Sequence, residues 1–259
     1  MKKMSVLIII TIILLFQINS EEIESKSDSK IKAAIFDLDG TLIDTQHFYD
    51  EIHQMLINKY GNGKIYTPEY KKFIHGTSST FGNRFIIDQF QINITLEEFI
   101  KIKENYLKEK LISNNSTEGA KELTNNLKYK YNLKTAIATS SYKDSVDFKL
   151  THHKEWIDSD IDLIITGEDK RIKSGKPSPD IFILTANILG VKLDECIIIQ
   201  DSIYGVKAAI SAGARIVVGL PDSLSDKYVM ETFQFDQYKT KLVILNSLKD
   251  FDYSILDTF

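Results

Sequence analysis

Hydrophobic and polar positions divide the chain after residue 30 into three stretches with different periods. The apolar run Ala33–Phe36 is short and predicts a buried strand. Residues 45–113 then place apolar side chains three or four positions apart, which is the period of helices that bury one face. From residue 117 onward, short apolar runs alternate with helical stretches. This order predicts an α/β protein in which a helical insert follows the first strand.

The insert is divided into helices by its turn residues. Gly61 and Gly63 end the first helical stretch, and Pro68 opens a short second one. Thr95 precedes the last stretch and is expected to cap it. The helices expected in the insert span residues 45–60, a short segment from Pro68, 80–90 and 95–112.

The remainder of the chain predicts a layered core. Strands are expected at residues 133–139, 161–166, 196–200, 215–219 and 242–245, and helices at 117–130, 143–152, 181–189 and 203–212. Ser178 is expected to cap the helix near residue 181, with Pro179 at its first position. Alternating strands and helices form a parallel sheet covered on both faces. We therefore predict a Rossmann-like parallel sheet core, residues 31–44 and 114–259, with a helical cap domain at residues 45–113.

The first 20 residues have the pattern of a secretory signal peptide. Two lysines precede an apolar run at residues 6–16, and the acidic pair Glu21-Glu22 follows. The run is shorter than the ~20 residues of a membrane-spanning helix, so an uncleaved anchor is the weaker alternative. We expect residues 1–20 to be removed and residues 21–30 to form a flexible lead-in. The protein would then be in the secretory pathway or extracellular, with a cytoplasmic location as the alternative.

Composition and charge narrow the range of partners. The 259 residues carry a net charge of −4 at pH 7 and no cluster of Lys and Arg, which argues against nucleic acid as a partner. The single cysteine, Cys196, excludes an intrachain disulfide. We expect a monomer that binds neither nucleic acid nor, once the signal peptide is removed, a membrane.

Two aspartates, Asp37 and Asp39, follow the first strand at alternate positions. Residues i and i+2 of an extended chain point to the same side, so both carboxylates face one space while Leu38 turns toward the core. Gly40 allows a sharp turn after them, and Thr41 adds a hydroxyl. Carboxylates crowded in this way repel each other unless a cation lies between them, which suits a divalent metal with one oxygen left as nucleophile. An acidic surface turn is the alternative interpretation of this motif alone.

Other residues that could carry chemistry also follow predicted strands. Thr139 and Ser140 end one strand, Asp201 follows another, and Lys176 lies in the loop after a third. Taken singly, these residues are typical of a strand end, a helix cap and a surface lysine. Ligands of parallel sheets bind beyond the carboxyl ends of the strands, so the ordered set predicts one shared site.

These segments resemble the motifs of the haloacid dehalogenase superfamily of phosphatases and mutases. The similar segments are IKAAIFDLDGTLIDT (31–45), TAIATSS (135–141), GKPSPDIF (175–182) and QDSIYGVKAAISAGA (200–214). The helical insert resembles the cap that the superfamily places after its first motif. Dehalogenases lack an aspartate at the position of Asp39, so the resemblance implies a phosphatase or a mutase. The segment ATSSYKDSVDFKLTHHKEW (138–156) is similar to the pseudouridine-5′-phosphatase and glycerol-3-phosphate phosphatase group.

The resemblance and the residue types imply a Mg²⁺-dependent phosphatase that hydrolyses a small phosphomonoester, such as a nucleotide-like, polyol or sugar phosphate. Asp37 would attack phosphorus and form an aspartyl-phosphate, and Asp39 would protonate the leaving oxygen and then activate water. Asp37, Asp201 and the backbone carbonyl of Asp39 would hold the metal. Lys176 would supply compensating positive charge. The phosphoryl oxygens would be bound by Thr139, Ser140 and Lys176.

Two departures from the superfamily pattern bear on function. The fourth motif has Gln200 where a glutamate is usual, which removes one negative charge near the expected metal. The loop around Gly76 lacks the usual Lys or Arg, and the nearest cation downstream is Arg84. The histidines of the insert have no partner motif and receive no role: His47, His53 and His75.

Two other functions fit the same sequence. A sugar phosphomutase shares the core residues. A catalytically silent, secreted binding protein is the alternative from another class, and Gln200 would then be a sign of lost activity.

Overall fold

The computed structural model describes residues 30–222, 224–232 and 240–257. The predicted signal peptide and residues 21–29 of the predicted lead-in lie outside the described residues. Within the described part, the strands form one parallel sheet in the order β3-β2-β1-β4-β5-β6. The strands are β1 (Ala33–Phe36), β2 (Lys134–Ala138), β3 (Leu163–Ile165), β4 (Cys196–Gln200), β5 (Ile216–Gly219) and β6 (Lys241–Ile244). The predicted fold class, an α/β Rossmann-like parallel sheet with an inserted helical cap, is confirmed.

The first strand lies at the centre of the sheet, where it is paired on both sides. Phe36, its last residue, is in register with Ile137 of β2 and Ile199 of β4. All four residues of β1 are buried, as expected for a strand covered by helices on both faces. The segments that follow β1, β2 and β4 therefore emerge side by side at one edge of the sheet.

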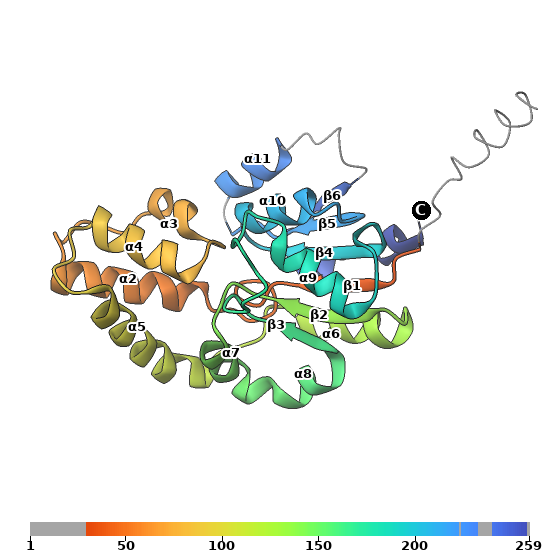
Figure 1. The fold of residues 1–259 in the computed structure, drawn as a ribbon, viewed down its shortest axis with the longest axis horizontal. Coiled ribbons are helices and arrows are strands. Elements are labelled where there is room, and N and C mark those ends of the chain that lie inside the picture. Colours follow the sequence, from red (N-terminus) through yellow and green to blue (C-terminus); the bar gives the residue numbers. More distant parts are fainter. Residues whose placement is uncertain (1–29, 223, 233–239, 258–259) are drawn as a thin grey trace, which may run out of the picture.

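Helices cover the two faces of the sheet and bury separate apolar clusters (Figure 1). One face is covered by α6 (Ala120–Asn125), α7 (Lys143–Leu150) and α8 (Lys154–Asp160). The other is covered by α9 (Asp180–Leu189), α10 (Ile203–Ser211) and α11 (Leu224–Glu231). No helix of the described residues is both long and apolar enough to cross a bilayer.

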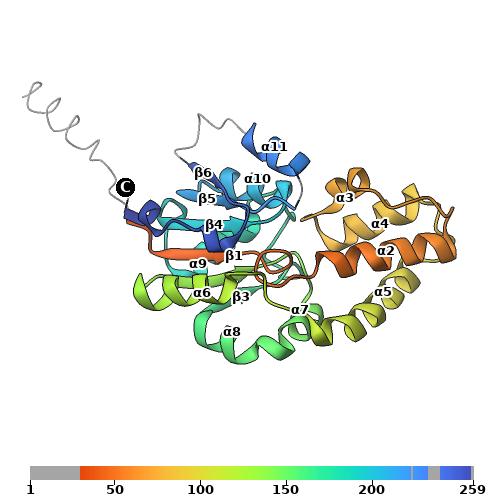
Figure 2. The ribbon, with the colours of Figure 1, turned by 180° about the vertical axis from the view of Figure 1, so that it is seen from behind.

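The helices of the insert pack together beyond the carboxyl ends of the strands (Figures 1 and 2). They are α2 (Gln46–Tyr60), α3 (Pro68–Ile74), α4 (Ser79–Gln89) and α5 (Leu96–Lys110). Their apolar faces enclose a cluster of their own, with Leu56, Phe90 and Phe99 fully buried. Thr95 caps α5 as predicted: its hydroxyl accepts from the amide of Glu98, whose carboxylate accepts from the amide of Thr95. The insert is thus a helical cap over the end of the sheet.

Two predicted helices are present with different ends, and one predicted helix cap is wrong. The helix expected at 143–152 ends at Leu150, and a short 3₁₀ turn separates it from α8, which the apolar pattern did not predict. The helix expected at 117–130 is α6 followed by a π-helical turn at Asn126–Lys130. Ser178 does not cap α9, because its hydroxyl donates to Asp180 at 2.6 Å and Pro179 takes the capping position.

Candidate active site

Asp37 lies directly after β1 and is paired with a buried lysine. Lys176 Nζ donates to Asp37 Oδ2 at 2.8 Å, to Gln200 Oε1 at 2.9 Å and to the carbonyl of Ala138 at 3.2 Å. The amide of Leu38 donates to the other carboxylate oxygen at 2.8 Å. Because Asp37 is 5% exposed and Lys176 is 3% exposed, this ion pair is shielded from water. Three acceptors fix the lysine against the carboxylate.

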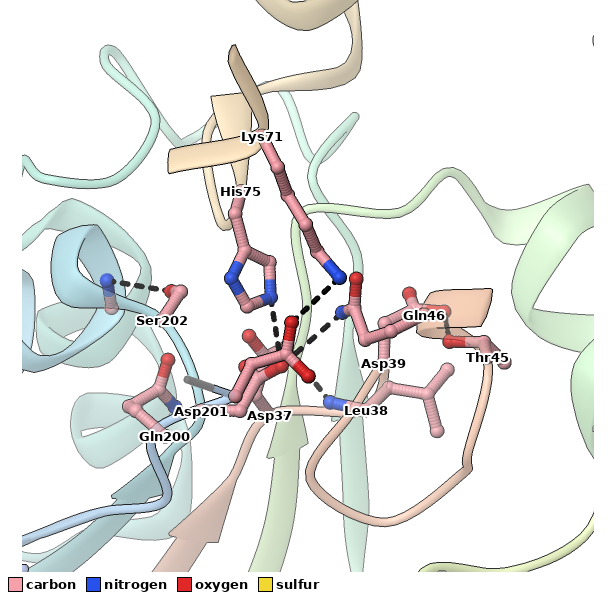
Figure 3. A network of polar contacts seen from close by, with 12 residues as sticks. Asp37, Leu38, Asp39, Thr45, Gln46, Lys71, His75, Gln200, Asp201 and Ser202 are labelled. Carbon is pink, nitrogen blue, oxygen red and sulfur yellow. Dashed lines mark hydrogen bonds and ion pairs between the residues drawn. The ribbon is translucent and has the colours of Figure 1, made fainter. Parts of the chain in front are cut away.

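A second carboxylate, Asp201, follows β4 beside the first. Burial raises the pKa of Asp37, Lys176 opposes the rise, and the negative charge of Asp201 adds to it. Asp201 Oδ2 accepts from Gln46 Nε2 at 3.2 Å and contacts His75 Nε2 at 2.9 Å (Figure 3). Gly40 packs so closely against Asp201 that an added Cβ would overlap its carboxylate, and its φ of +73° also favours glycine.

These two carboxylates fit a magnesium ion. Mg²⁺ in proteins is held by one or two carboxylates and keeps further oxygen ligands from water, backbone or substrate phosphate. Asp37 and Asp201 supply the two carboxylates, and their mutual repulsion is what a divalent cation would relieve. No cluster of three or more His, Cys, Asp or Glu side chains that could hold a metal occurs among residues 30–222, 224–232 and 240–257. A metal here would therefore use other oxygens as well, such as the backbone carbonyl of Asp39.

Asp39 is surrounded by three donors. Thr45 Oγ1 donates to Oδ1 at 2.6 Å, while Ser141 Oγ and Lys149 Nζ donate to Oδ2 at 2.7 and 2.6 Å. Burial alone would raise the pKa of Asp39, but the charge of Lys149 and these hydrogen bonds outweigh it and lower the pKa. The same pairing raises the pKa of Lys149 despite its burial. Asp37 and Asp39 thus have separate lysine partners.

The remaining predicted residues lie at the end of β2. The amide of Thr139 donates to the carbonyl of Ile165 at 3.0 Å, and its hydroxyl accepts from the amide of Ser141 at 3.1 Å. This turn places Thr139 and Ser140 on the wall of the cavity that Asp37 also lines. The sequence-predicted residues therefore lie in one place: five of them line this cavity, and Lys176 is bonded to Asp37.

The cavity has a volume of about 120 Å³ and lies between the strand ends and the cap. Its cap side contains two buried polar atoms without a hydrogen-bond partner, Asp50 Oδ1 and His53 Nδ1. Burial and the nearby Lys103 and Lys71 lower the pKa of His53 to about 3, so its ring is neutral at pH 7. Burial and the charge of Lys149 lower the pKa of Lys103 to about 8. The cap therefore presents polar groups to the cavity.

Several residues of this site received no role from the sequence. His75 contacts the buried Asp201 from the cap (Figure 3). Lys71 bonds to Asp50 at 3.0 Å and to Asp222 at 2.6 Å. In the sequence, Lys149 is one polar position of a predicted helix, and no motif marks it as a site residue. Gly76, the neighbour of His75, packs against Ser202 of the core. This contact between cap and core could not be recognised from the sequence.

The chain matches a known protein family over most of its length. The family model described as haloacid dehalogenase-like hydrolase matches residues 34–218, which is most of the chain. The chain belongs to the haloacid dehalogenase-like hydrolases. Within this family it is 30% identical over 224 residues to a Drosophila melanogaster protein named "Probable pseudouridine-5'-phosphatase", covering 86% of this chain and 92% of the relative.

Two further family members extend the comparison. The chain is 31% identical to the "Phosphorylated carbohydrates phosphatase" of Thermotoga maritima, over 85% of this chain and 99% of the relative. A HAD hydrolase of Entamoeba histolytica has the same fold, with a TM-score of 0.69 and 24% identity over 87% of this chain and 97% of that one. Membership in this hydrolase family and relatives named phosphatases identify the chain as a phosphoric monoester hydrolase.

Proposed function

We propose that this haloacid dehalogenase-like hydrolase is a Mg²⁺-dependent phosphatase that hydrolyses small phosphomonoesters through a phosphorylated Asp37. The observation that carries the proposal is the buried Asp37 at the end of β1, with the Lys176 ammonium on one side and the Asp201 carboxylate nearby. A nucleophilic carboxylate needs a cation beside it to receive a phosphoryl group that is itself negative. Lys176 supplies that charge.

The reaction divides into two transfers. In the first, an oxygen of Asp37 attacks phosphorus, the bond from phosphorus to the ester oxygen breaks, and Asp39 gives a proton to that oxygen. In the second, water attacks phosphorus, the bond to Asp37 breaks, and Asp39 takes a proton from the water. Thr139 and Ser140 line the cavity where they can donate hydrogen bonds to the phosphoryl oxygens. The first transfer leaves Asp37 phosphorylated and Asp39 ionised, and the second returns both groups to their starting state.

Magnesium would be held by Asp37, Asp201 and the backbone carbonyl of Asp39, and when bound it would neutralise charge on the phosphate. Gln200 does not compete for this role. Its Oε1 accepts from Lys176 at 2.9 Å, and its Nε2 donates to the carbonyl of Ile199 at 2.8 Å. A neutral amide at this position orients Lys176 without adding a third carboxylate.

The alcohol that the reaction releases is a short polyol or a sugar rather than a nucleoside. A cavity of about 120 Å³ is smaller than the ~300–1,000 Å³ of sites for drug-sized ligands. Asp50 Oδ1 and His53 Nδ1 are buried without partners, and hydroxyl groups can satisfy both because they donate and accept. The relative named for phosphorylated carbohydrates supports this class.

A phosphate-release assay tests the proposal. Purified protein with Mg²⁺ should release phosphate from glycerol phosphates and small sugar phosphates faster than from nucleoside monophosphates, and EDTA should abolish the release. A mutase would instead interconvert sugar phosphate isomers with little release. Absence of both activities in folded protein would favour a silent binding protein.

A further inference from the structure

Lys149 is a fully buried lysine that the two transfers above do not use. It lies on α7, has no solvent exposure, and donates from Nζ to Asp39 Oδ2 at 2.6 Å and to Ser141 Oγ at 2.7 Å. Its Nζ also lies 5.4 Å from the centre of the Tyr49 ring of the cap. Removing an ammonium from water costs several kcal/mol unless a partner and hydrogen bonds compensate. Because burial of this ammonium costs free energy, we look for its role at its partner, Asp39.

The hydrogen bonds around Asp39 define that task. A carboxylate on a short side chain has a broad torsional preference and turns easily when few donors hold it. Thr45 holds one oxygen of Asp39, whereas Ser141 and Lys149 hold the other. Lys149 also donates to Ser141, so it orients the second donor as well. Without Lys149, Oδ2 of Asp39 would keep only the neutral Ser141 hydroxyl as a donor. That hydroxyl would also be less constrained, because it would lose its hydrogen bond from Lys149.

We propose that Lys149 is a positioning residue that fixes the Asp39 carboxylate in the orientation from which Asp39 exchanges protons with the leaving oxygen and with water. This rests on the proposed function, because it takes Asp39 to be the acid and base. Positioning of this kind has a large effect on the reaction rate, because a misplacement of a catalytic group by about 1 Å can lower the rate about 10²-fold. Lys176 cannot replace it, because its three acceptors are Asp37, Ala138 and Gln200.

The choice of substrate separates the two transfers. p-Nitrophenolate leaves without a proton, so phosphorylation of Asp37 by p-nitrophenyl phosphate does not need Asp39. Hydrolysis of the phosphorylated Asp37 does need it, because the attacking water must lose a proton. A protein with a misplaced Asp39 should therefore phosphorylate quickly and hydrolyse slowly on this substrate, whereas both transfers should be slow on an alkyl phosphate.

The test uses the variant Lys149→Met, which keeps an unbranched side chain one atom shorter than lysine and removes its charge. With Mg²⁺ and p-nitrophenyl phosphate, we expect kcat and KM to fall together by about 10²-fold, so that kcat/KM, which reports binding and phosphorylation of Asp37, changes by less than about threefold. Rapid mixing should show a burst of about one equivalent of p-nitrophenolate. Lys149→Arg should restore at least about tenfold of the lost kcat. The control Lys154→Met removes an exposed lysine paired with Asp158 and should leave kcat unchanged.

A double-mutant cycle with Asp39→Asn decides whether Lys149 acts through Asp39. We expect Lys149→Met to change kcat by less than about threefold in the Asp39→Asn protein. An equal loss in both backgrounds, or a Lys149→Met protein with normal kcat per folded molecule, would overturn the proposal.

If Lys149→Met does not fold, Ser141→Ala removes the other donor to the same oxygen. It should lose about tenfold in kcat and show the same burst, and normal kcat without a burst would overturn the proposal. A wild-type protein that releases no phosphate would instead refute the proposed function.

Discussion

Loss of the Lys176 ammonium should destabilise the protein as well as inactivate it. Lys176→Met leaves Asp37 and Asp201, which are 5% and 3% exposed, without the cation now bonded to Asp37. Removal of one partner of a buried ion pair typically costs about 3–5 kcal/mol, because the remaining charge is uncompensated. For a domain of this size that corresponds to a fall in Tm of roughly 6–20 °C.

The pH dependence of this loss has a definite sign. The pKa of Asp37 is already raised in the folded protein, so the folded state holds a proton that the unfolded state releases, and stability falls as pH rises through the raised pKa. Lys176 opposes that rise, so its removal should raise the pKa of Asp37 further. The destabilisation should therefore be larger near pH 8 than near pH 5, because a higher pKa makes Asp37 of the variant easier to protonate as the pH falls.

Urea unfolding without added metal measures both effects. Wild-type and Lys176→Met proteins would be compared at pH 5 and pH 8 in EDTA, with Lys143→Met as a control for an exposed lysine paired with Asp147. The control should change the free energy of unfolding by less than about 1 kcal/mol. A cost below about 1 kcal/mol for Lys176→Met, or a cost that grows toward acid pH, would refute the electrostatic reasoning.

Further predictions concern the other parts of the site. Asp37→Asn should abolish phosphate release, with folding checked by circular dichroism; full activity would exclude Asp37 as the nucleophile. Gly40→Ala should displace the Asp201 carboxylate and weaken Mg²⁺ binding by at least about tenfold in calorimetry, because its Cβ would occupy the position of that carboxylate. Asp50→Asn should raise KM for glycerol phosphate more than KM for p-nitrophenyl phosphate, and equal increases would exclude a contact with leaving-group hydroxyls. Protein expressed in a eukaryotic host should begin near Glu21; an intact Met1 on cytosolic protein would contradict secretion.

The sequence was sufficient for features that depend on local pattern. The apolar run before Asp37 and the alternation of strands and helices predicted the parallel sheet, because each strand buries both faces and each helix buries one. The rule that parallel strands carry ligands at their carboxyl ends placed Thr139 and Asp201 close to Asp37 before any coordinates.

Contacts between distant segments could not be predicted in this way. Lys149 is an ordinary polar position in an amphipathic helix, and only packing brings it to Asp39, which lies 110 positions away in the sequence. His75 is a cap residue whose contact with Asp201 depends on how the cap sits on the core. Competition between hydrogen-bond acceptors could not be predicted either: the Ser178 hydroxyl donates to Asp180 instead of capping the helix.

The most direct test of catalysis through Asp37 is to identify the residue that becomes phosphorylated. Protein mixed with Mg²⁺ and a substrate would be quenched in acid, reduced with borohydride to convert an acyl phosphate to an alcohol, digested, and mapped by mass spectrometry. Asp37 alone should be converted to homoserine, and the conversion should require substrate. Turnover without modification of Asp37, or modification of Asp39 instead, would contradict the role of Asp37 as the nucleophile.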